Sequence, residues 1–408
     1  MRCVPMDLLN RRAFSPMESM SAACPAWLAT HLKQLGGVTS FRQYMDLALN
    51  DPNHGFYGSG CARVARDGDF VTSPALGSDF AGLLAPQVLR WLAELPAEIP
   101  TLSIIEIGPG EGDLLADLVD ALAERSPQIL DRLELVLVEA NPGMKQRQQE
   151  RLQHQTNIPM RWCGLDELVS APLRGVVLAH ELLDALPVER LTYDDGVMWQ
   201  QLVELDDDGA LVFSKGPLPP QLATEIERVC KRCGLDLPPP DVDPGWTTEW
   251  HSDLLGWFTQ LSQVLDQGVL LVVDYALEMH RYYSARRSDG TLMAVQAQRA
   301  GLSPLHKPGS QDLTAHICIE TVEDAAVQAG WSCLGQLRQG EALLALGLAE
   351  RLYGLQSLPP GDLPQALQRR ESMLRLVDPS GLGDFRWLLF GKRVNPASFK
   401  LPTAPDSA

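Results

Sequence analysis

Short apolar runs alternate with amphipathic stretches through much of this chain. Apolar runs of strand length occur at residues 102–107, 133–140, 175–180, 268–275 and 384–392, with a weaker one near "MRWCG" (160–164). After the runs at 102–107 and 133–140, apolar residues recur at helical spacing over residues 113–124 and 142–153, respectively. Continuous apolar strands that alternate with helices indicate a parallel sheet with helices on both faces.

The N-terminal part departs from this alternation. The stretch "TSFRQYMDLALNDPNHGFYG" (39–58) predicts a helix that Thr39 or Ser40 caps and "NDPNHG" ends. A short extended piece, a loop at Thr72 and Ser73, and another helix follow. These elements predict a helical cap ahead of the sheet.

An insertion interrupts the sheet after residue 184. It should contain strands joined by "DDG" turns (189–216), a helix (219–233), a proline-rich loop (235–245) and a helix (249–265). We therefore expect six segments along the chain: a disordered or targeting tail (1–35), a helical cap (36–100), the first part of the core (101–184), an inserted substrate or cap subdomain (185–265), the second part of the core with a polar acceptor loop at 276–316 (266–395), and a tail (396–408).

Composition and charge favour a globular protein over a nucleic-acid-binding or membrane-spanning one. The 408 residues are 45% hydrophobic and 21% charged, as in a globular protein with a sizeable core. The net charge of -18 argues against nucleic acid as the main partner, because phosphate binding needs clustered Lys and Arg. An acidic surface would still attract a basic protein. No apolar run approaches the roughly 18 residues of a membrane span.

The cysteines and the N-terminal stretch indicate the cellular compartment of the protein. The eight cysteines are scattered, which indicates free thiols in a reducing compartment. Cys230 and Cys233 form a lone CxxC, which we interpret as the end of an ordinary helix because a zinc site needs a second pair. The N-terminal stretch is compatible with a weak organellar signal. We therefore expect a cytoplasmic protein in a bacterium and a mitochondrial-matrix protein in a eukaryote.

The stretch "IIEIGPGEGDLL" (104–115) carries the main chemical signal. Glu106, Gly108, Gly110 and Gly112 join a strand to the start of a helix, where backbone N–H groups and the helix dipole favour an anionic group. A dinucleotide fingerprint would place the third glycine one residue later, with an acid about 20 residues on. The spacing therefore disfavours NAD.

S-adenosyl-L-methionine (SAM) suits the same turn, because its methionine part has a carboxylate for the N–H groups and an ammonium for an adjacent acid. Glu139 ends the next strand, where it would accept hydrogen bonds from the two ribose hydroxyls. Asp166 lies in "LDEL" (165–168), after the weaker strand, and would lie along the adenine. Two acids framing three glycines favour a ligand site over a purely structural turn.

The fourth strand ends in "AHELLDALPV" (179–188). Glu181 and Asp184 there lie at the carboxyl edge of the sheet, where open α/β sheets bind ligands. Two carboxylates at this edge suit a cation, although Asp184 could instead cap a helix. Asp274, at the end of the next strand, lines the acceptor side or caps a loop. No two histidines have metal-ligand spacing with a carboxylate, so we expect no metal.

These motifs resemble the MidA-like methyltransferases, a family that includes a mitochondrial complex I assembly methyltransferase and bacterial relatives. The resemblance covers about residues 39–395. It depends on these motifs in this order: "FRQYMDLALNDPNHGFYG", "GDFVTSP", "EIGPGEGDLLADL", "VEANPGM", "HELLDALPV", "VVDY", "DGTL" and "PGSQDLTAHI". The combination is more specific than the glycine turn alone.

The resemblance implies a class I SAM-dependent methyltransferase fold, which is α/β and Rossmann-like: a seven-stranded mixed sheet with helices on both faces, a helical N-terminal cap and an inserted α+β subdomain. It implies methyl transfer to an arginine of a respiratory NADH dehydrogenase (complex I type) subunit, aiding its assembly. By position, the family's cofactor motif matches Glu106, Gly108, Gly110, Gly112 and Glu139, and its N-terminal strip, expected near the cofactor, matches Thr72 and Ser73. The family's strip after the fourth strand matches Glu181 and Asp184, which we expect to be catalytic. Independently of the resemblance, we add Asp166 and His180 to the expected cofactor residues, because they lie near presumed strand ends.

The chain departs from the family pattern on the acceptor side. Ala276, His180 and Ala81 stand where Gly, Asn and Gly are usual. Two alternatives therefore remain open at this point: a small-molecule methyltransferase, and a SAM-binding assembly factor that acts without turnover. The expected partner is a protein substrate, with no nucleic acid and no membrane span, and homodimerisation is left open.

Overall fold

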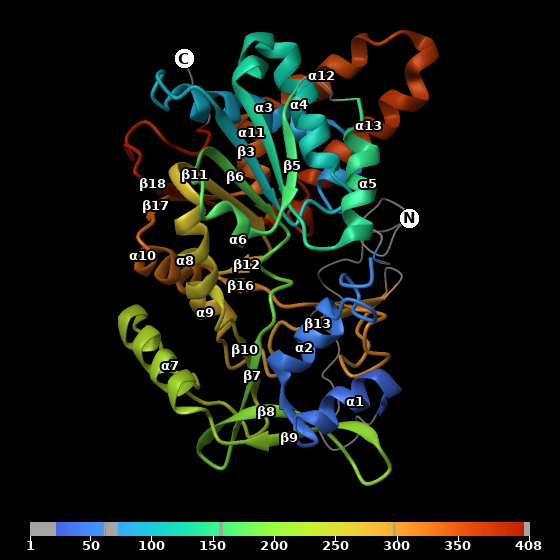
Figure 1. Ribbon diagram of the computed structural model, residues 1–408, viewed down its shortest axis with the longest axis vertical. Coiled ribbons are helices and arrows are strands. Elements are labelled where there is room, and N and C mark those ends of the chain that lie inside the picture. The colour runs from blue at the N-terminus through green and yellow to red at the C-terminus, as the bar shows by residue number, and fades with distance from the viewer. Residues whose placement is uncertain (1–21, 61, 63–71, 155–157, 297–298, 404–408) are drawn as a thin grey trace.

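The computed structural model describes residues 22–60, 62, 72–154, 158–296 and 299–403 (Figure 1). Its upper half in Figure 1 is built on a seven-stranded sheet. The strands, in order across the sheet, are β5 (Met160–Cys163), β4 (Leu133–Val138), β3 (Leu102–Ile107), β6 (Leu173–His180), β11 (Leu265–Asp274), β18 (Arg386–Lys392) and β17 (Ser332–Arg338).

The sheet is mixed because one strand runs against the others. β5, β4, β3, β6 and β11 pair in parallel, whereas β18 is antiparallel to both of its neighbours. This confirms the α/β class I methyltransferase fold that the sequence predicted. The parallel strands place their carboxyl ends at one edge, which is where a ligand site of such a sheet forms.

Helices cover both faces of the sheet, because successive residues of each strand point to opposite sides. Ile104 packs with one set of helices and Ile105 with the other. The first set contains α3 (Asp79–Ala93), α4 (Asp113–Arg125), α5 (Pro142–Leu152), α11 (Gln339–Ala345), α12 (Leu348–Gly354) and α13 (Leu363–Leu376). The second contains α6 (Leu165–Leu168), α8 (Leu254–Val264) and α10 (Ile319–Gln328).

A second, antiparallel sheet forms the lower half of Figure 1. It consists of β1 (Ala22–Ala23), β9 (Ala210–Gly216), β8 (Val197–Leu205), β7 (Glu189–Asp194) and β10 (Thr247–Trp250), and β2 (Val38–Ser40) also pairs with β8. The N-terminal helices α1 (Ala26–Gln34) and α2 (Phe41–Asn50) pack on it. The N-terminal segment and the insertion therefore share one core, although more than a hundred residues separate them in sequence.

The segment 276–316 also enters that core. It contains β12 (Ala276–Leu277), α9 (Met279–Tyr282), β13 (Met293–Gln296), β14 (Arg299–Ala300) and β15 (Asp312–Thr314), and β12 pairs with β16 (Ile317–Cys318). Leu305 and Leu313 are buried against α1 and α2. The sequence predicted an irregular polar loop here, because elements this short leave no clear periodicity.

Three other expectations need correction. Residues 26–34 were assigned to a terminal tail but form α1, because Leu28 and Leu32 lie on one helical face and are buried. α3 was assigned to the cap but packs on α4 and on β6 of the core sheet, so it is buried on almost all sides. Residues 249–250 were assigned to the start of a helix but belong to β10, which pairs with β7, because Trp favours strands; the helix α8 begins only at Leu254.

The C-terminal segment is also part of the core. Phe399 and Leu401 are buried in the cluster beneath α3, and the Lys400 carbonyl accepts hydrogen bonds from Trp91 and Gln87. Residues 1–21 and 404–408 of the expected tails lie outside the described residues. α7 (Pro220–Cys233) ends at the CxxC motif, and both of its cysteines are free thiols. None of the described helices combines the length and apolar character needed to cross a membrane.

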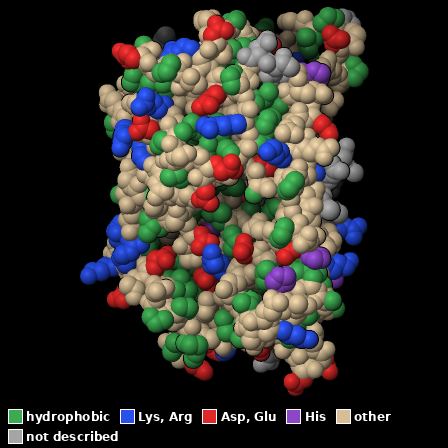
Figure 2. Space-filling view, in the orientation of Figure 1, with side chains coloured by type: hydrophobic (Ala, Val, Ile, Leu, Met, Phe, Trp, Pro, Cys, Tyr) green, Lys and Arg blue, Asp and Glu red, His purple; other side chains and the backbone are tan. Residues whose placement is uncertain are grey.

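Charged side chains on the face shown in Figure 2 are mixed rather than segregated. Acidic and basic groups lie beside one another over both halves of the molecule. Because opposite charges are interspersed, this face carries no broad field of one sign.

Candidate active site

A cavity of about 750 Å³ opens at the carboxyl ends of β3, β4 and β6. Its walls come from the glycine turn, the start of α5, the loop after β6 and the segment that follows α2. The predicted site residues that line it are Thr72, Glu106, Gly108, Gly110, Glu139, His180 and Glu181. Its volume is in the range of small-molecule and cofactor sites.

The glycine turn adopts a backbone conformation that only glycine accepts readily. Gly108, Gly110 and Gly112 have φ values of 66°, 53° and 86°. A Cβ atom on Gly108 would lie 2.8 Å from Leu182 Cδ1. The turn therefore brings bare backbone against the cavity, and α4 begins directly after it.

Glu106 ends β3 with its side chain buried. Its Oε2 atom accepts no hydrogen bond from the described residues. Burial, and to a lesser degree the charge of Asp113, raise the pKa of Glu106 to about 8, although a hydrogen bond from the Leu115 backbone opposes the shift. An ammonium group in the cavity would supply the missing partner and favour the charged carboxylate.

Glu139 follows β4 and is held by two donors. Its Oε1 accepts from the Asn141 backbone N–H at 2.8 Å and its Oε2 accepts from Gln148 Nε2 at 3.1 Å. Burial raises the pKa of Glu139, and these hydrogen bonds oppose the shift. Each carboxylate oxygen has a second lone pair, so the group can still accept hydrogen bonds from a ligand.

His180 is the last residue of β6 and Glu181 follows it, where the backbone is strained. Glu181 has a φ of 50°, which is uncommon for a residue other than glycine, and its N–H donates to the Val273 carbonyl at 2.8 Å. Glu181 Oε1 lies 3.3 Å from His180 Nδ1 but accepts no hydrogen bond from the described residues. Burial lowers the pKa of His180 to about 3, so the imidazole is neutral at pH 7.

A cluster of acids extends behind Glu181. Burial raises the pKa of Glu181 and of Asp184 well above their usual range, and the charge of Asp274 raises both further. Asp312 adds to the effect on both and accepts a hydrogen bond from the Tyr57 hydroxyl at 2.8 Å. The cluster therefore holds protons in the free protein and would ionise if a cation entered it.

Four predicted site residues do not line the cavity. Ser73 is fully buried and hydrogen-bonds to Gln339, but its backbone N–H faces Glu181 and lowers the pKa of that carboxyl. Gly112 lies beneath the turn as the cap of α4. Asp184 is buried in the acid cluster. Asp166 is exposed and accepts a hydrogen bond from Gln260 at 2.6 Å, so its contact with adenine stays a prediction.

The structure also adds residues that the sequence did not single out for the site. Tyr57, Glu111 and Asn141 line the cavity, and Asp312 lies behind it. Tyr57 and Asp312 come from motifs far from the sheet, so no spacing rule connects them. Among the described residues, no three His, Cys, Asp or Glu side chains are grouped as metal ligands.

Comparison with known proteins identifies the ligand. A family described as S-adenosyl-L-methionine-dependent methyltransferases matches residues 83–337. The chain belongs to this family. The match spans the glycine turn, the strand that precedes Glu139 and the loop after β6. The protein is therefore a SAM-dependent methyltransferase.

Relatives and solved structures agree with this assignment. Proteins named as mitochondrial protein arginine methyltransferases NDUFAF7 are 26% identical in Drosophila melanogaster, over 85% of this chain and 80% of theirs, and 25% identical in Danio rerio, over 94% and 90%. A Burkholderia thailandensis protein with bound S-adenosyl-homocysteine is 29% identical, with a TM-score of 0.79 over 91% of this chain and 92% of that one.

The cavity fits SAM on features of this chain. Glu106 Oε2 and Glu111 Oε1 are buried carboxylate oxygens without a hydrogen-bond partner among the described residues, as an ammonium would require. The N–H groups of the glycine turn and the start of α4 suit a carboxylate. The contact of Glu139 with the ribose stays a prediction. When bound, SAM supplies an activated methyl group to the acceptor.

We expect a branched side chain at Gly108 to block the cofactor. Gly108→Val should weaken SAM by about 100-fold or more, because the side chain would project toward Leu182. Gly196→Val is the matched control, since Gly196 also has a positive φ but no atom of the described residues lies within 4 Å of its Cβ position. Calorimetry with SAM and with NAD measures the effect. Tight NAD binding by the unmodified protein, without SAM binding, would contradict the assignment of the turn.

Replacing Glu139 should weaken SAM without unfolding the protein. For Glu139→Gln we expect a loss of about 1–3 kcal/mol in binding free energy, because the amide cannot accept from both ribose hydroxyls. Glu134→Gln, at the far end of the same strand, is the control and should bind normally. A normal SAM affinity together with a lowered melting temperature in Glu139→Gln would show that the residue is structural.

SAM affinity should depend on pH through Glu106. The carboxylate form binds the ammonium, and with a pKa of about 8 this form becomes scarcer as the pH falls. Affinity should therefore drop about tenfold per unit between roughly pH 7.5 and 6. Calorimetry over this range should find a much smaller slope for Glu106→Gln. An equal slope in both proteins would assign the titration to another group.

Proposed function

We propose that this methyltransferase acts on an arginine of a protein, namely a subunit of a respiratory NADH dehydrogenase (complex I type), and thereby aids its assembly. The related proteins of Drosophila melanogaster and Danio rerio are named as mitochondrial protein arginine methyltransferases. The motifs of the sequence resemble the family that acts on this enzyme complex. In a eukaryotic cell the protein would act in the mitochondrial matrix, and in a bacterium in the cytoplasm.

The observation that carries the proposal is the acid cluster beside the cofactor cavity. Glu181 lines that cavity and has one carboxylate oxygen without a hydrogen-bond partner among the described residues. Asp184, Asp274 and Asp312 lie close enough to raise the pKa of Glu181, of Asp184 or of both. Buried carboxylates are costly unless a cation neutralises them. An arginine side chain inserted into the cavity would supply that charge.

A guanidinium needs help to act as a nucleophile. Its lone pair is delocalised, and its pKa exceeds about 12. A carboxylate can bind two of its N–H groups at once and draw the positive charge toward them, which leaves the third nitrogen more electron-rich. On this proposal Glu181 makes that contact and Asp184 supports it from within the cluster. Transfer then depends mainly on holding the nitrogen in line with the methyl group.

His180 lies beside Glu181 and can only relay the proton that the methylated nitrogen releases, because burial disfavours its charged form. Its imidazole is neutral at pH 7, and its Nε2 has no hydrogen-bond partner among the described residues. The nitrogen becomes a stronger acid once it forms its bond to carbon, so no strongly basic group is required. The nearby Phe80 ring packs edge-on to the imidazole, with centroids 5.3 Å apart, and holds it in place.

The test separates turnover from cofactor binding. Glu181→Gln should bind SAM normally, because the residue contacts the acceptor, and should lose about 100-fold or more of its turnover. Mass spectrometry of candidate NADH dehydrogenase subunits, co-expressed with the unmodified protein or the variant, measures arginine methylation. Glu124→Gln, an exposed carboxylate on α4, is the control and should retain full activity.

Three outcomes would contradict the proposal. Equal arginine methylation with the unmodified protein and with Glu181→Gln would remove the residue from the reaction. Methyl groups found only on a metabolite would indicate a small-molecule methyltransferase. Normal complex assembly with a variant that binds the subunit but transfers no methyl group would indicate an assembly factor that acts without turnover.

A further inference from the structure

The segment that follows α2 forms one wall of the cofactor cavity. We call residues 57–60 together with Ala62 the strap. Tyr57, Gly58 and Ser59 line the cavity, although the strap belongs to neither sheet. It precedes the glycine turn by about fifty residues in the sequence, so only tertiary contacts can hold it there.

Asn141 makes one of these contacts at the start of α5. Its Nδ2 atom donates to the Tyr57 carbonyl at 3.3 Å and also to the Gly58 carbonyl, and its backbone N–H donates to Glu139. A Cβ atom on Gly60 would lie 2.8 Å from Asn141 Oδ1. Glycine at this position therefore allows the strap to lie directly against the start of the helix.

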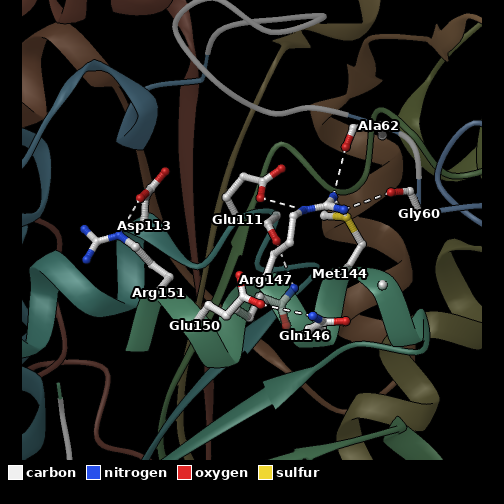
Figure 3. A network of polar contacts seen from close by, with 12 residues as sticks. Gly60, Ala62, Glu111, Asp113, Met144, Gln146, Arg147, Glu150 and Arg151 are labelled. Atoms are coloured by element: carbon white, nitrogen blue, oxygen red, sulfur yellow. Dashed lines mark hydrogen bonds and ion pairs between the residues drawn. The ribbon is translucent and has the colours of Figure 1, made fainter. Parts of the chain in front are cut away.

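Arg147, nearly two turns further along α5, makes the larger set of contacts (Figure 3). Its guanidinium donates to the Gly60 carbonyl at 2.9 Å, to the Ala62 carbonyl at 3.0 Å and to Glu111 Oε2 at 2.8 Å. Arg147 and Glu111 are each only 19% exposed. A charged group shielded in this way forms stronger hydrogen bonds than one in water.

This arrangement joins three parts of the cofactor site through one side chain. Arg147 holds one oxygen of Glu111, and the other oxygen, Oε1, is buried without a partner among the described residues. Because Glu111 lies in the glycine turn and lines the cavity, its orientation determines where an ammonium can be bound. The same guanidinium also holds the strap.

Arg151, the next arginine along α5, provides a contrast. It pairs with Asp113 and Asp117 of α4 at 2.7 Å each, and it is 39% exposed. Figure 3 shows Arg151 pointing away from the strap, with Arg147 pointing toward it. Both arginines tie α5 to an acid at the glycine turn or the start of α4, but only Arg147 contacts the strap.

We propose that Arg147 is a positioning residue for the cofactor: it latches the strap over SAM and orients Glu111 toward the ammonium of SAM. On this proposal, the strap contacts bound SAM from the cavity wall, so the hydrogen bonds from Arg147 to the strap determine how long the cofactor stays bound. The proposal depends on the family's cofactor and not on the identity of the methyl acceptor.

The strap also reaches the acceptor side. The Tyr57 hydroxyl donates to Asp312 Oδ1 at 2.8 Å, and Asp312 contributes to the acid cluster around Glu181. A closed strap therefore fixes one member of that cluster as well as one wall of the cofactor cavity. Cofactor binding should for this reason prepare the acceptor pocket.

The test compares Arg147→Met with Arg151→Met in the full-length protein. Arg147→Met should raise the Kd for SAM and the KM for SAM about tenfold, through faster dissociation, and should change kcat by less than about twofold. Arg151→Met should leave both constants within about twofold. A loss of helix packing alone would affect the two variants equally. A raised KM for SAM with a nearly unchanged kcat in Arg147→Met, but not in Arg151→Met, would therefore show that Arg147 acts through the strap.

Hydrogen exchange supplies a second readout in the strap itself. The Gly58 N–H donates to Leu49 and the Ser59 N–H donates to Gly55, both at 2.9 Å. SAM should slow exchange of these amides in the unmodified protein and in Arg151→Met, and should do so much less in Arg147→Met. This measurement follows the local opening of the strap rather than global stability.

Arg147→Lys serves as the conservative variant. Lysine keeps the charge but lacks the planar fork that reaches two carbonyls and a carboxylate together. Its SAM affinity should therefore fall between those of the unmodified protein and Arg147→Met, and it can replace Arg147→Met if that variant fails to fold. Unchanged SAM affinity in Arg147→Met, equal losses in Arg147→Met and Arg151→Met, or unchanged exchange of the strap would each overturn the proposal.

Discussion

The burial of several carboxylates at one edge of a parallel sheet governs the chemistry of this protein. Glu106, Glu139, Glu181 and Asp274 lie at or just after the ends of β3, β4, β6 and β11, which are neighbouring strands in the sheet. Neighbouring strands lie about 4.8 Å apart, so these acids cannot all be ionised without counter-charges. We therefore expect the cavity to favour cations, with the ammonium of SAM as the first of them.

Part of the cavity wall comes from segments outside the core sheet. The strap follows α2 and the loop after β6 leads into the antiparallel sheet, while Asp312 belongs to the segment 276–316. These segments share one hydrophobic core with α1, α2 and the inserted strands. Packing in that second core positions Tyr57 and Asp312, so the acceptor side depends on contacts far from the reaction.

Local patterns were informative wherever the chemistry depends on a few adjacent residues. The spacing of Gly108, Gly110 and Gly112, followed by an acid at the next strand end, distinguished SAM from a dinucleotide. The βα alternation predicted β3, α4, β4 and α5 to within about two residues at each end, because each has a buried face of regular period. The same patterns did not predict the short elements between residues 276 and 316.

The sequence by itself determined the fold class, the cofactor and the acids at the strand ends, because strand periodicity and the glycine turn are local properties of the chain. Only the tertiary structure decided which acids line the cavity, that Asp184 lies buried behind Glu181, and that Arg147 joins the strap to Glu111. The contacts of Arg147 with Glu111 and Gly60, for example, join residues that are 36 and 87 positions apart in the sequence. They arise from the packing of two cores against each other, which no local pattern encodes.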